Sequence, residues 1–252
     1  MAYTLVLMRH GESVWNQLDK FTGWTDVELS AKGIQEAKSA GIAMAQHGLE
    51  FDLAYTSVLD RAIDTLQYAL EGAHMTWIPV IKDWRLNERH YGGLQGKNKA
   101  ESVDEFGEYQ VKVWRRAFAI KPPLLSEYDS RYPANDDRYE DIPEEELPIG
   151  ESLKDTLDRV KPYWESELKP AILSGKRLII SAHGNSLRAL LKFLENISDN
   201  KIIDIEIPTG NPLVYELDEL DLKVLKKYYL IGEEKQENKG VLTKLKSIFK
   251  LK

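Results

Sequence analysis

Two short apolar segments of the chain each lead into a histidine that is followed by a glycine. Residues 3–8 form a nearly unbroken apolar run before Arg9 and His10, and residues 177–182 form a second run before His183. Apolar runs of this kind are typical of strands buried on both faces of a parallel sheet. Because open α/β sheets bind ligands at the carboxyl ends of their strands, we expect both imidazoles to face one shared ligand.

A single strand followed by His-Gly is weak evidence, since most histidines at such positions are structural. Here the pattern occurs twice, at Gly11 and at Gly184, which favours a functional pair. We expect Gly11 to permit either an unusual φ/ψ angle or the close approach of a ligand, because glycine has no Cβ.

Helix and strand signals along the remaining chain predict an α/β protein with one domain, whose mostly parallel central sheet carries helices on both faces. Ser30 is a candidate N-cap for a helix that ends near Gly48, and Ser152 with Asp155 opens another that ends near residues 174–175. Ser102 with Glu105 forms a capping box that predicts a helix from residue 102 to residue 116. Further strands are expected at residues 51–56, 77–81, 202–207, 213–215 and 224–230.

Residues 121–150 contain five prolines and the acidic run 144–146. A loop of this length inside a compact domain is usually functional or mobile. We interpret the acidic run itself as solvated surface. From residue 232 to residue 252 the chain becomes polar and then basic, which predicts a flexible basic C-terminal tail after a domain that spans residues 1–231.

Composition excludes several classes of protein. The chain of 252 residues has no cysteine, which excludes disulfides, thiolate catalysis and cysteine-ligated metal, and we expect a cytoplasmic protein. Its net charge of −7 argues against general nucleic-acid binding. Its apolar runs are far shorter than the roughly 20 residues that cross a bilayer, and the N-terminus lacks the pattern of a signal peptide, so we expect no membrane association.

Candidate functional residues gather at the predicted strand ends and in neighbouring loops: Arg9, His10, Arg61, Glu88, Arg89, Lys99, Arg115, Arg116 and His183. Six of them are permanently cationic in a chain that is acidic overall, and arginine binds phosphate and carboxylate oxygens in a bidentate manner. The expected ligand is therefore a small anionic molecule. A neutral imidazole can carry a phosphoryl group as a covalent intermediate, and the cations disfavour imidazolium at His10. With no metal-binding motif in the sequence, we expect chemistry without a metal.

The two histidine segments, LMRHGES at 7–13 and AHGNS at 182–186, resemble those of the histidine phosphatase superfamily. More narrowly, the chain resembles the 2,3-bisphosphoglycerate-dependent phosphoglycerate mutases over roughly residues 3–231. The segments that carry this resemblance are FTGWTD (21–26), LNERHYG (86–92), LQGKNKA (94–100), WRR (114–116), ESLKDT (151–156) and PTGNPLVYEL (208–217). Other phosphatases of the superfamily share the histidine segments but lack this whole set.

The resemblance implies a role for each matching residue. His10 is implied as the phosphorylated nucleophile, with His183, Arg9 and Arg61 stabilising the transferring phosphoryl group, and Glu88 exchanging the proton of the substrate hydroxyl. The residues implied to hold the rest of the substrate are Asn16, Thr22, Gly23, Arg89, Tyr91, Lys99, Arg115, Arg116, Gly184 and Asn185. The implied reaction interconverts 3-phosphoglycerate and 2-phosphoglycerate in glycolysis and gluconeogenesis, with 2,3-bisphosphoglycerate as the primer.

Two features depart from the family pattern. Asn211 stands where relatives commonly have Ile, and we expect the effect of this change to be local. The C-terminal tail is not the Ala-rich tail that can exclude water from the phosphohistidine, so the tail bears on the ratio of mutase to phosphatase activity. The alternatives are a phosphomonoesterase with the same nucleophile and a non-catalytic phosphoglycerate-binding protein. The resemblance also implies a homo-oligomer, and we expect a dimer.

Overall fold

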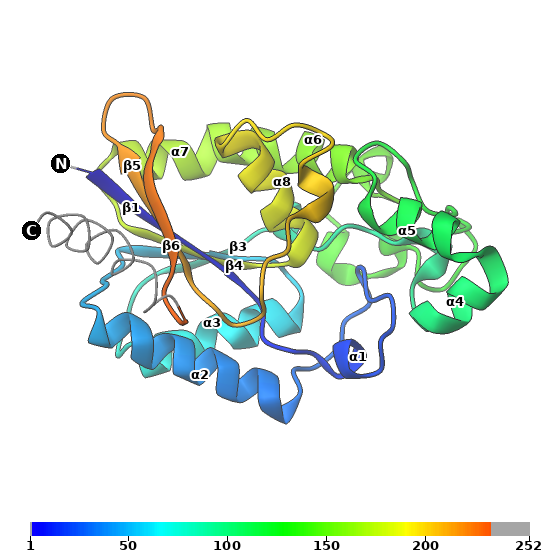
Figure 1. Ribbon diagram of the computed structural model, residues 1–252, viewed down its shortest axis with the longest axis horizontal. Coiled ribbons are helices and arrows are strands. Elements are labelled where there is room, and N and C mark those ends of the chain that lie inside the picture. Colours follow the sequence, from blue (N-terminus) through cyan, green and yellow to red (C-terminus); the bar gives the residue numbers. More distant parts are fainter. Residues whose placement is uncertain (1, 233–252) are drawn as a thin grey trace, which may run out of the picture.

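The computed structural model describes residues 2–232, which form one α/β domain around a six-stranded sheet (Figure 1). The strands are β1 (Ala2–Arg9), β2 (Leu53–Thr56), β3 (Val80–Lys82), β4 (Leu178–Ala182), β5 (Leu213–Asp218) and β6 (Val224–Tyr229), and their order in the sheet is β3-β2-β4-β1-β5-β6. Strands β1 to β4 run parallel, whereas β5 is antiparallel to both of its neighbours. The prediction of a mostly parallel sheet is confirmed.

Helices cover both faces of this sheet, as predicted (Figure 1). One face packs against α2 (Ala31–Gln46) and α3 (Asp60–Gly72), and the other against α6 (Leu153–Tyr163), α7 (Lys169–Leu173) and α8 (Gly184–Leu194). A π-helical turn, Trp164–Leu168, joins α6 to α7. Successive residues of β1 point into opposite layers, with Val6 in the core under α2 and α3 and Leu7 in the other core. This burial on two faces explains why the first strand is apolar without alternation.

Shorter elements surround the carboxyl edge of the parallel strands. They are α1 (Val14–Gln17), α4 (Lys99–Phe106), α5 (Glu108–Arg116) and the 3₁₀ turns Trp84–Leu86, Gly92–Leu94, Pro133–Asn135, Asp137–Tyr139, Glu144–Glu146 and Ile202–Asp204. Residues 121–150 form the long connection expected from their prolines, and only 3₁₀ turns interrupt this part of the described chain. Arg131 ties the connection to the rest of the molecule, because its Nη1 donates to the carbonyl of Gln95 at 2.6 Å.

The predicted helix caps are partly confirmed. The hydroxyl of Ser30 accepts the N–H of Gly33 at 3.1 Å, and the capping box of Ser152 and Asp155 is present. The capping box predicted at Ser102 is wrong, because α4 begins at Lys99 and its N-cap is Asn98. The side chain of Asn98 already satisfies the first N–H groups of the helix, and α4 then ends at Gly107, whose φ of 84° cannot continue an α-helix.

The strand predicted at residues 202–207 is also wrong. This segment contains the 3₁₀ turn Ile202–Asp204 and runs outside the sheet. Ile202 and Ile207 are buried while Glu206 is exposed. The apolar side chains of this pattern therefore pack inward from a loop and not from a strand. β1 already pairs with β4 and β5, and only an isolated bridge between Arg9 and Thr209 connects the chain just after this segment to the sheet. The strand expected at residues 77–81 is limited to Val80–Lys82.

Among residues 2–232, no helix is long and apolar enough to cross a membrane. The tail predicted at residues 232–252 lies, from residue 233 onward, outside the described residues.

Candidate active site

Strands β1 and β4 bring the two His-Gly segments together. Arg9 pairs in register with Ala182, and the N–H of His10 donates to the carbonyl of Ala182 at 2.9 Å. His10 and His183 therefore leave the sheet side by side, with ring centroids 5.1 Å apart. Both side chains are buried. The prediction that the two imidazoles share one edge of the sheet is confirmed.

The surroundings of His10 keep its imidazole neutral. Its Nδ1 lies 2.7 Å from the carbonyl oxygen of Gly11, which can only accept, so Nδ1 carries the proton and Nε2 keeps a lone pair. Burial, and then the positive charges of Arg61 and Arg9, lower the pKa of His10 well below 6.5. Burial and Arg61 likewise lower the pKa of His183. Unprotonated Nε2 is the state that a nucleophile requires.

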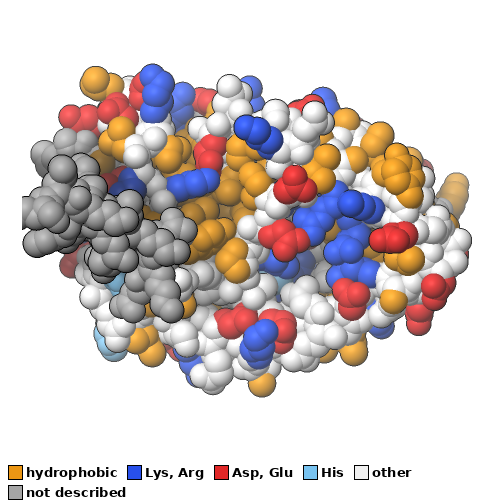
Figure 2. Space-filling view, viewed as in Figure 1, with side chains coloured by type: hydrophobic (Ala, Val, Ile, Leu, Met, Phe, Trp, Pro, Cys, Tyr) orange, Lys and Arg blue, Asp and Glu red, His pale blue; other side chains and the backbone are white. Residues whose placement is uncertain are grey.

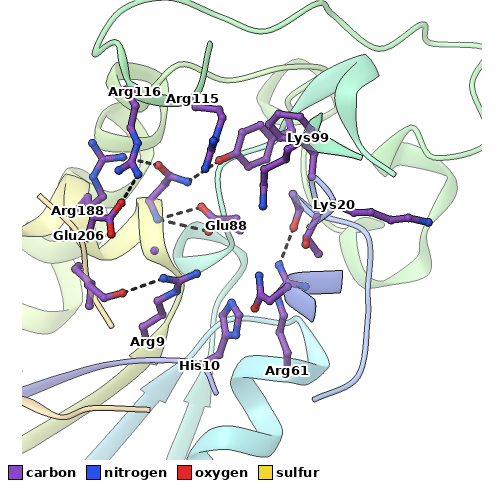
Figure 3. A pocket seen from close by; sticks show the side chains of 18 of the residues that line it. Arg9, His10, Lys20, Arg61, Glu88, Lys99, Arg115, Arg116, Arg188 and Glu206 are labelled. Atoms are coloured by element: carbon purple, nitrogen blue, oxygen red, sulfur yellow. Dashed lines mark hydrogen bonds and ion pairs between the residues drawn. The ribbon is translucent and has the colours of Figure 1, made fainter. Parts of the chain in front are cut away.

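Arg9 and Arg61 flank His10 from opposite sides (Figure 3). Arg61 lies in the first turn of α3 and donates from Nη2 to the carbonyl of Gly23 at 2.7 Å, while Nη1 of Arg9 donates to the carbonyl of Ile207 at 2.9 Å. Within residues 2–232, the Nε atoms of both arginines are buried and have no hydrogen-bond partner. Such donors are costly unless an anion accepts from them, so their surroundings suit a phosphate group.

Glu88 lies across the pocket from His10 (Figure 3). Its Oε1 accepts the N–H groups of Arg89 at 2.7 Å and of Asn185, in the first turn of α8, at 3.1 Å. The carboxylate is only slightly exposed, and it lines the same cavity as the nucleophile. This position suits a group that exchanges a proton with a ligand bound between the two residues.

The residues around this centre enclose a cavity of about 200 Å³ whose charge is strongly positive. Its cationic side chains are Arg9, Lys20, Arg61, Lys99, Arg115, Arg116 and Arg188. Glu88 and Glu206 are its only carboxylates among the described residues. Figure 2 shows basic side chains gathered around a hollow in this region of the surface. The size and the charge of the cavity fit a small molecule with several negative charges.

Comparisons with known proteins agree with this geometry. Residues 5–129 match the histidine phosphatase superfamily (branch 1). A 2,3-bisphosphoglycerate-dependent phosphoglycerate mutase from Treponema denticola is 58% identical over 231 residues, which make up 92% of this chain and 93% of that protein. This chain belongs to the phosphoglycerate mutase family of the histidine phosphatase superfamily.

Several solved structures share the fold. A structure described as mycobacterial hydrolase 1 superimposes with a TM-score of 0.68 at 22% identity, covering 90% of this chain and 97% of that chain. A phosphoglycerate mutase from Bacillus anthracis superimposes with a TM-score of 0.61 at 20% identity, covering 85% and 88% respectively. At these identities the similarity concerns the architecture alone.

Most of the residues expected for a phosphoglycerate mutase line the cavity. They are Arg9, His10, Asn16, Thr22, Gly23, Arg61, Glu88, Tyr91, Lys99, Arg115, Arg116, Gly184 and Asn185. His183 and Arg89 are fully buried behind this lining. Arg89 stacks over the ring of Tyr91 at 4.6 Å and donates to the carbonyl of Arg115 at 3.0 Å. Within residues 2–232 its Nε and Nη1 are buried and have no hydrogen-bond partner, as is the case for Nε of Arg9 and Arg61.

Three charged residues of the cavity were not expected from the sequence: Lys20, Arg188 and Glu206. Arg188 is nearly buried and donates to Asn185 Oδ1 at 2.9 Å and to the carbonyl of Ile202 at 2.6 Å. Its position four residues after Gly184 could have revealed it, because residues i and i+4 share a helix face. Glu206 forms an ion pair with Arg116 at the cavity, and the mistaken strand at 202–207 concealed this role.

Gly11 has a different function from the two that were expected. Its φ lies outside the left-handed region, and the group that approaches it is the protein backbone. A Cβ added to Gly11 would lie 2.3 Å from the carbonyl oxygen of Gly33, in the first turns of α2. Gly11 thus allows α2 to pack directly against the segment that follows the nucleophile.

The departure at Asn211 is accommodated locally, as expected. Its Nδ2 donates to the carbonyl of Ile231 at 2.8 Å, and its Oδ1 accepts the N–H of Ile231 at 3.1 Å. The amide thus links the start of β5 to the chain just after β6.

No cluster of three or more His, Asp, Glu or Cys residues suited to a metal ion occurs in the part of the chain that is described.

Proposed function

We propose that this protein is a 2,3-bisphosphoglycerate-dependent phosphoglycerate mutase, which interconverts 3-phosphoglycerate and 2-phosphoglycerate in glycolysis and gluconeogenesis. The 58% identity to the Treponema denticola mutase supports this function. The structural observation that carries it is the neutral, buried His10, whose unprotonated Nε2 lies among arginines and across the cavity from Glu88.

Once charged, His10 first gives its phosphoryl group to the free hydroxyl of the substrate, so its N–P bond breaks while a new O–P bond forms. Its freed Nε2 then attacks the phosphorus of the phosphate that the substrate brought, so an N–P bond forms while that O–P bond breaks. Arg9, Arg61 and His183 stabilise the negative charge that spreads over the phosphoryl oxygens during both transfers. The second transfer leaves the product with its phosphate on the neighbouring oxygen and His10 phosphorylated again.

Glu88 balances the protons of the two steps. It accepts the proton of the attacking hydroxyl in the first transfer, and it gives a proton to the substrate oxygen that the phosphoryl group leaves in the second. Hydrogen bonds from the main chain at Arg89 and Asn185 fix the carboxylate on one side. Oε2 accepts only a longer bond, at 3.5 Å, from the N–H of Asn185, so this oxygen can still exchange a proton with the substrate.

When bound, 2,3-bisphosphoglycerate supplies the phosphoryl group that first charges His10. The cavity fits a ligand with two phosphates and a carboxylate, because its seven cations outnumber its two carboxylates. The proposed holding residues are Asn16, Thr22, Gly23, Tyr91, Lys99, Arg115, Arg116, Gly184 and Asn185, with Arg89 behind them. Lys20 and Arg188 add to the positive field.

The test is a coupled assay from 3-phosphoglycerate to 2-phosphoglycerate, with and without added 2,3-bisphosphoglycerate, in which released phosphate is also recorded. Conversion that depends on the primer and releases little phosphate is the expected result. Phosphate release without isomerisation would identify a phosphomonoesterase, and binding without either reaction would identify a phosphoglycerate-binding protein. A His10→Ala variant with full turnover would contradict the covalent mechanism altogether.

We also propose a homodimer in the cytoplasm that acts on a small phosphorylated substrate and binds neither nucleic acid nor membrane. The family resemblance supports the dimer, and the net charge of −7 argues against a nucleic-acid partner. Light scattering of the purified full-length protein tests the oligomeric state, and a mass corresponding to one chain of 28.9 kDa would exclude the dimer.

A further inference from the structure

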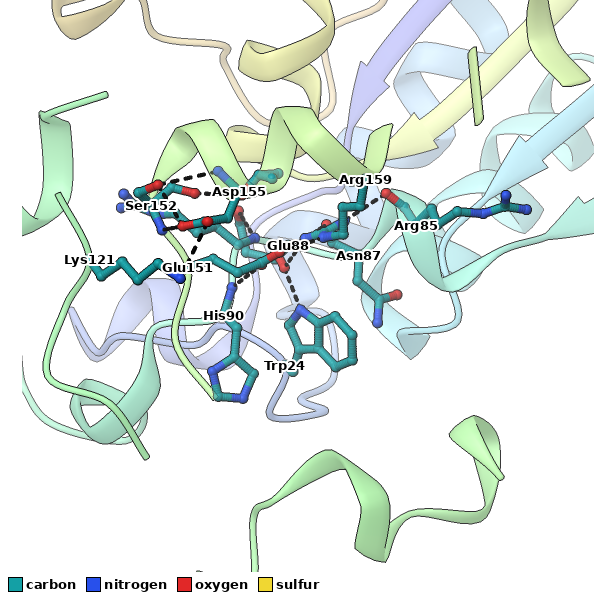
Figure 4. Close-up of polar contacts among 12 residues, drawn as sticks. Trp24, Arg85, Asn87, Glu88, His90, Lys121, Glu151, Ser152, Asp155 and Arg159 are labelled. Atoms are coloured by element: carbon teal, nitrogen blue, oxygen red, sulfur yellow. Dashed lines mark hydrogen bonds and ion pairs between the residues drawn. The ribbon is translucent and has the colours of Figure 1, made fainter. Parts of the chain in front are cut away.

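Two side chains outside the cavity hold Glu88 from behind, through its main-chain carbonyl (Figure 4). Nη2 of Arg159, on α6, donates to the carbonyl of Glu88 at 2.9 Å, and Nε1 of Trp24 donates to the same oxygen at 2.6 Å. In front, the carboxylate of Glu88 accepts two main-chain N–H groups. This residue is therefore fixed at both ends.

Arg159 also holds the neighbouring residues of the same segment. Its Nη1 donates to the carbonyl of Arg85 at 2.6 Å, and Nη2 donates to that of Asn87 at 3.0 Å. Its Nε lies 2.7 Å from Oε1 of Glu151, and both side chains of this ion pair are almost completely buried.

Glu151 continues the same network beyond Glu88. Its Oε2 accepts the N–H of His90 at 2.7 Å, and its own N–H donates to the carbonyl of His90 at 2.8 Å. The contacts of Arg159 and Glu151 thus extend along the main chain from residue 85 to residue 90. The segment that they hold includes Glu88 at its centre.

A buried ion pair is weak evidence for stability, because desolvation of both charges offsets their attraction. What distinguishes this pair is the target of its other hydrogen bonds, which are main-chain atoms of the segment that carries Glu88. We propose that Arg159 and Glu151 are positioning residues, which set the place of Glu88 for proton exchange with the substrate. This inference rests on the role of Glu88 in the proposed function.

The expected effect concerns turnover more than binding. Proton transfer needs heavy atoms within about 2.6–3.2 Å of each other, and a displacement of about 1 Å can reduce a rate by roughly 100-fold. The cations that line the cavity, such as Arg116 on α5, lie on other segments and supply most of the proposed contacts with the phosphates and the carboxylate of the substrate. Loss of the pair therefore lowers kcat and has a much smaller effect on KM.

The variant that tests the pair is Arg159→Met combined with Glu151→Gln. It removes both charges together, so that neither is left buried without its partner, and Gln retains an oxygen for the N–H of His90. We expect kcat to fall by about 30-fold while KM changes by less than roughly threefold. Trp24→Phe removes a single donor to Glu88 and keeps the aromatic packing against Tyr139, and it should lower kcat by about fivefold.

Arg85→Met is the matched control. Arg85 lies on the same segment and pairs with Asp83 at 2.6 Å, but its side chain makes no contact with Glu88 among those that the described residues form. It also stacks over Tyr163 at 4.3 Å, so its removal costs stability without touching the carbonyl of Glu88. We expect kcat of this variant to stay within about twofold of wild type.

Thermal melting of each protein accompanies the kinetics. If kcat of the double variant equals that of Arg85→Met, the pair is structural only and the inference is overturned. If the double variant does not fold, Trp24→Phe decides, and its unchanged kcat would equally overturn the inference. A wild-type protein that does not interconvert the phosphoglycerates contradicts the proposed function but not this inference. The rate of the phosphoryl transfer that the wild type does catalyse, such as phosphate release, is then compared among the same variants.

Discussion

The hydroxyl of Ser57 lies 2.7 Å from Nε2 of His183, at the end of β2 next to β4. Both side chains are fully buried, and Ser57 Oγ also accepts the N–H of Leu59. Burial and Arg61 lower the pKa of His183, so its ring is neutral and has one N–H. The contact with Ser57 therefore fixes the orientation of this ring beside that of His10, whose centroid is 5.1 Å away.

Ser57→Ala should therefore impair phosphoryl transfer. We expect kcat to fall by roughly tenfold, because removal of a positioned donor costs about 10²–10³-fold and Ser57→Ala removes only the group that orients His183. Ser181→Ala is the control, because Ser181 is equally buried and donates to the carbonyl of Ala62 at 3.0 Å, away from the cavity. Steady-state assays of both variants check the prediction, and equal activities would show that Ser57 does not orient His183.

Acidification below neutral pH should destabilise the folded protein through its buried histidines. Burial lowers the pKa of His10, of His183 and of His90, the last to about 3, so each stays neutral in the fold. The unfolded chain binds protons at these groups below a pH of about 6.5, and each histidine then removes about 1.4 kcal/mol per pH unit from the unfolding free energy. This loss continues until the pH reaches the folded-state pKa. Urea unfolding at pH 7.5 and pH 5.5 measures it, and equal free energies would contradict the assignment of neutral rings.

The ion pair between Glu206 and Arg116 places a negative charge at a cavity that binds anions. The Arg116 guanidinium lowers the pKa of Glu206, so this carboxylate is ionised at neutral pH. Glu206→Gln should therefore tighten substrate binding and lower KM by about two- to fivefold, which is the range of an exposed pair.

A remote pair of the same kind provides the control for Glu206→Gln. Glu165 pairs with Lys169 at 2.8 Å, and neither residue lines the cavity. Glu165→Gln should therefore leave KM unchanged. Initial rates at a series of 3-phosphoglycerate concentrations give both values. A raised KM in Glu206→Gln would mean that the carboxylate assists binding.

The parts of the fold that the sequence revealed are those whose cause is local. The strands before His10 and His183 are apolar because helices cover both of their faces, and Ser30 and Ser152 are caps by their own hydroxyl groups. The strand expected at 202–207 failed for a reason that is not local. Whether an alternating segment enters a sheet depends on which strands the rest of the fold places beside it, and β5 already pairs with β1 on the side away from β4.

The residues of the site also fall into those with a local signal in the sequence and those without one. Residues attached to a recognisable segment, such as His10 and Glu88, were predicted correctly as members of one cavity. Glu206 was missed because only the path of its loop brings it to Arg116, which is 90 positions away in the chain. Arg159 was missed because three of its hydrogen bonds go to main-chain carbonyls behind the cavity and two go to Glu151, a relation that no periodicity in α6 records.

Removal of metal ions should leave the activity unchanged. Arginine and lysine side chains around the cavity supply the positive charge that a metal supplies in other phosphoryl-transfer enzymes. We expect equal rates before and after incubation with EDTA followed by gel filtration. Activity that disappears with EDTA and returns with Mn²⁺ would contradict this prediction.

Gly33→Ala sets two effects on stability against each other: the higher helix propensity of alanine, and the close packing of α2 against the segment that follows His10. Gly33 lies inside α2, where alanine is favoured over glycine by about 1 kcal/mol. Its added Cβ, however, would lie 2.0 Å from the carbonyl oxygen of Glu12, a backbone atom that cannot rotate away. Overpacking of this kind typically costs about 1–3 kcal/mol, so we expect a net loss of unfolding free energy.

The same displacement reaches the catalytic centre, because Glu12 is two residues from His10. Gly33→Ala should therefore lower kcat as well as stability, whereas Gly93→Ala should affect neither strongly, since its Cβ meets only ordinary contacts of 3.5 Å or more. Urea unfolding and steady-state kinetics on the two variants measure both effects. A Gly33→Ala protein that is more stable than wild type and fully active would mean that α2 can move away from the segment after β1 without disturbing the nucleophile.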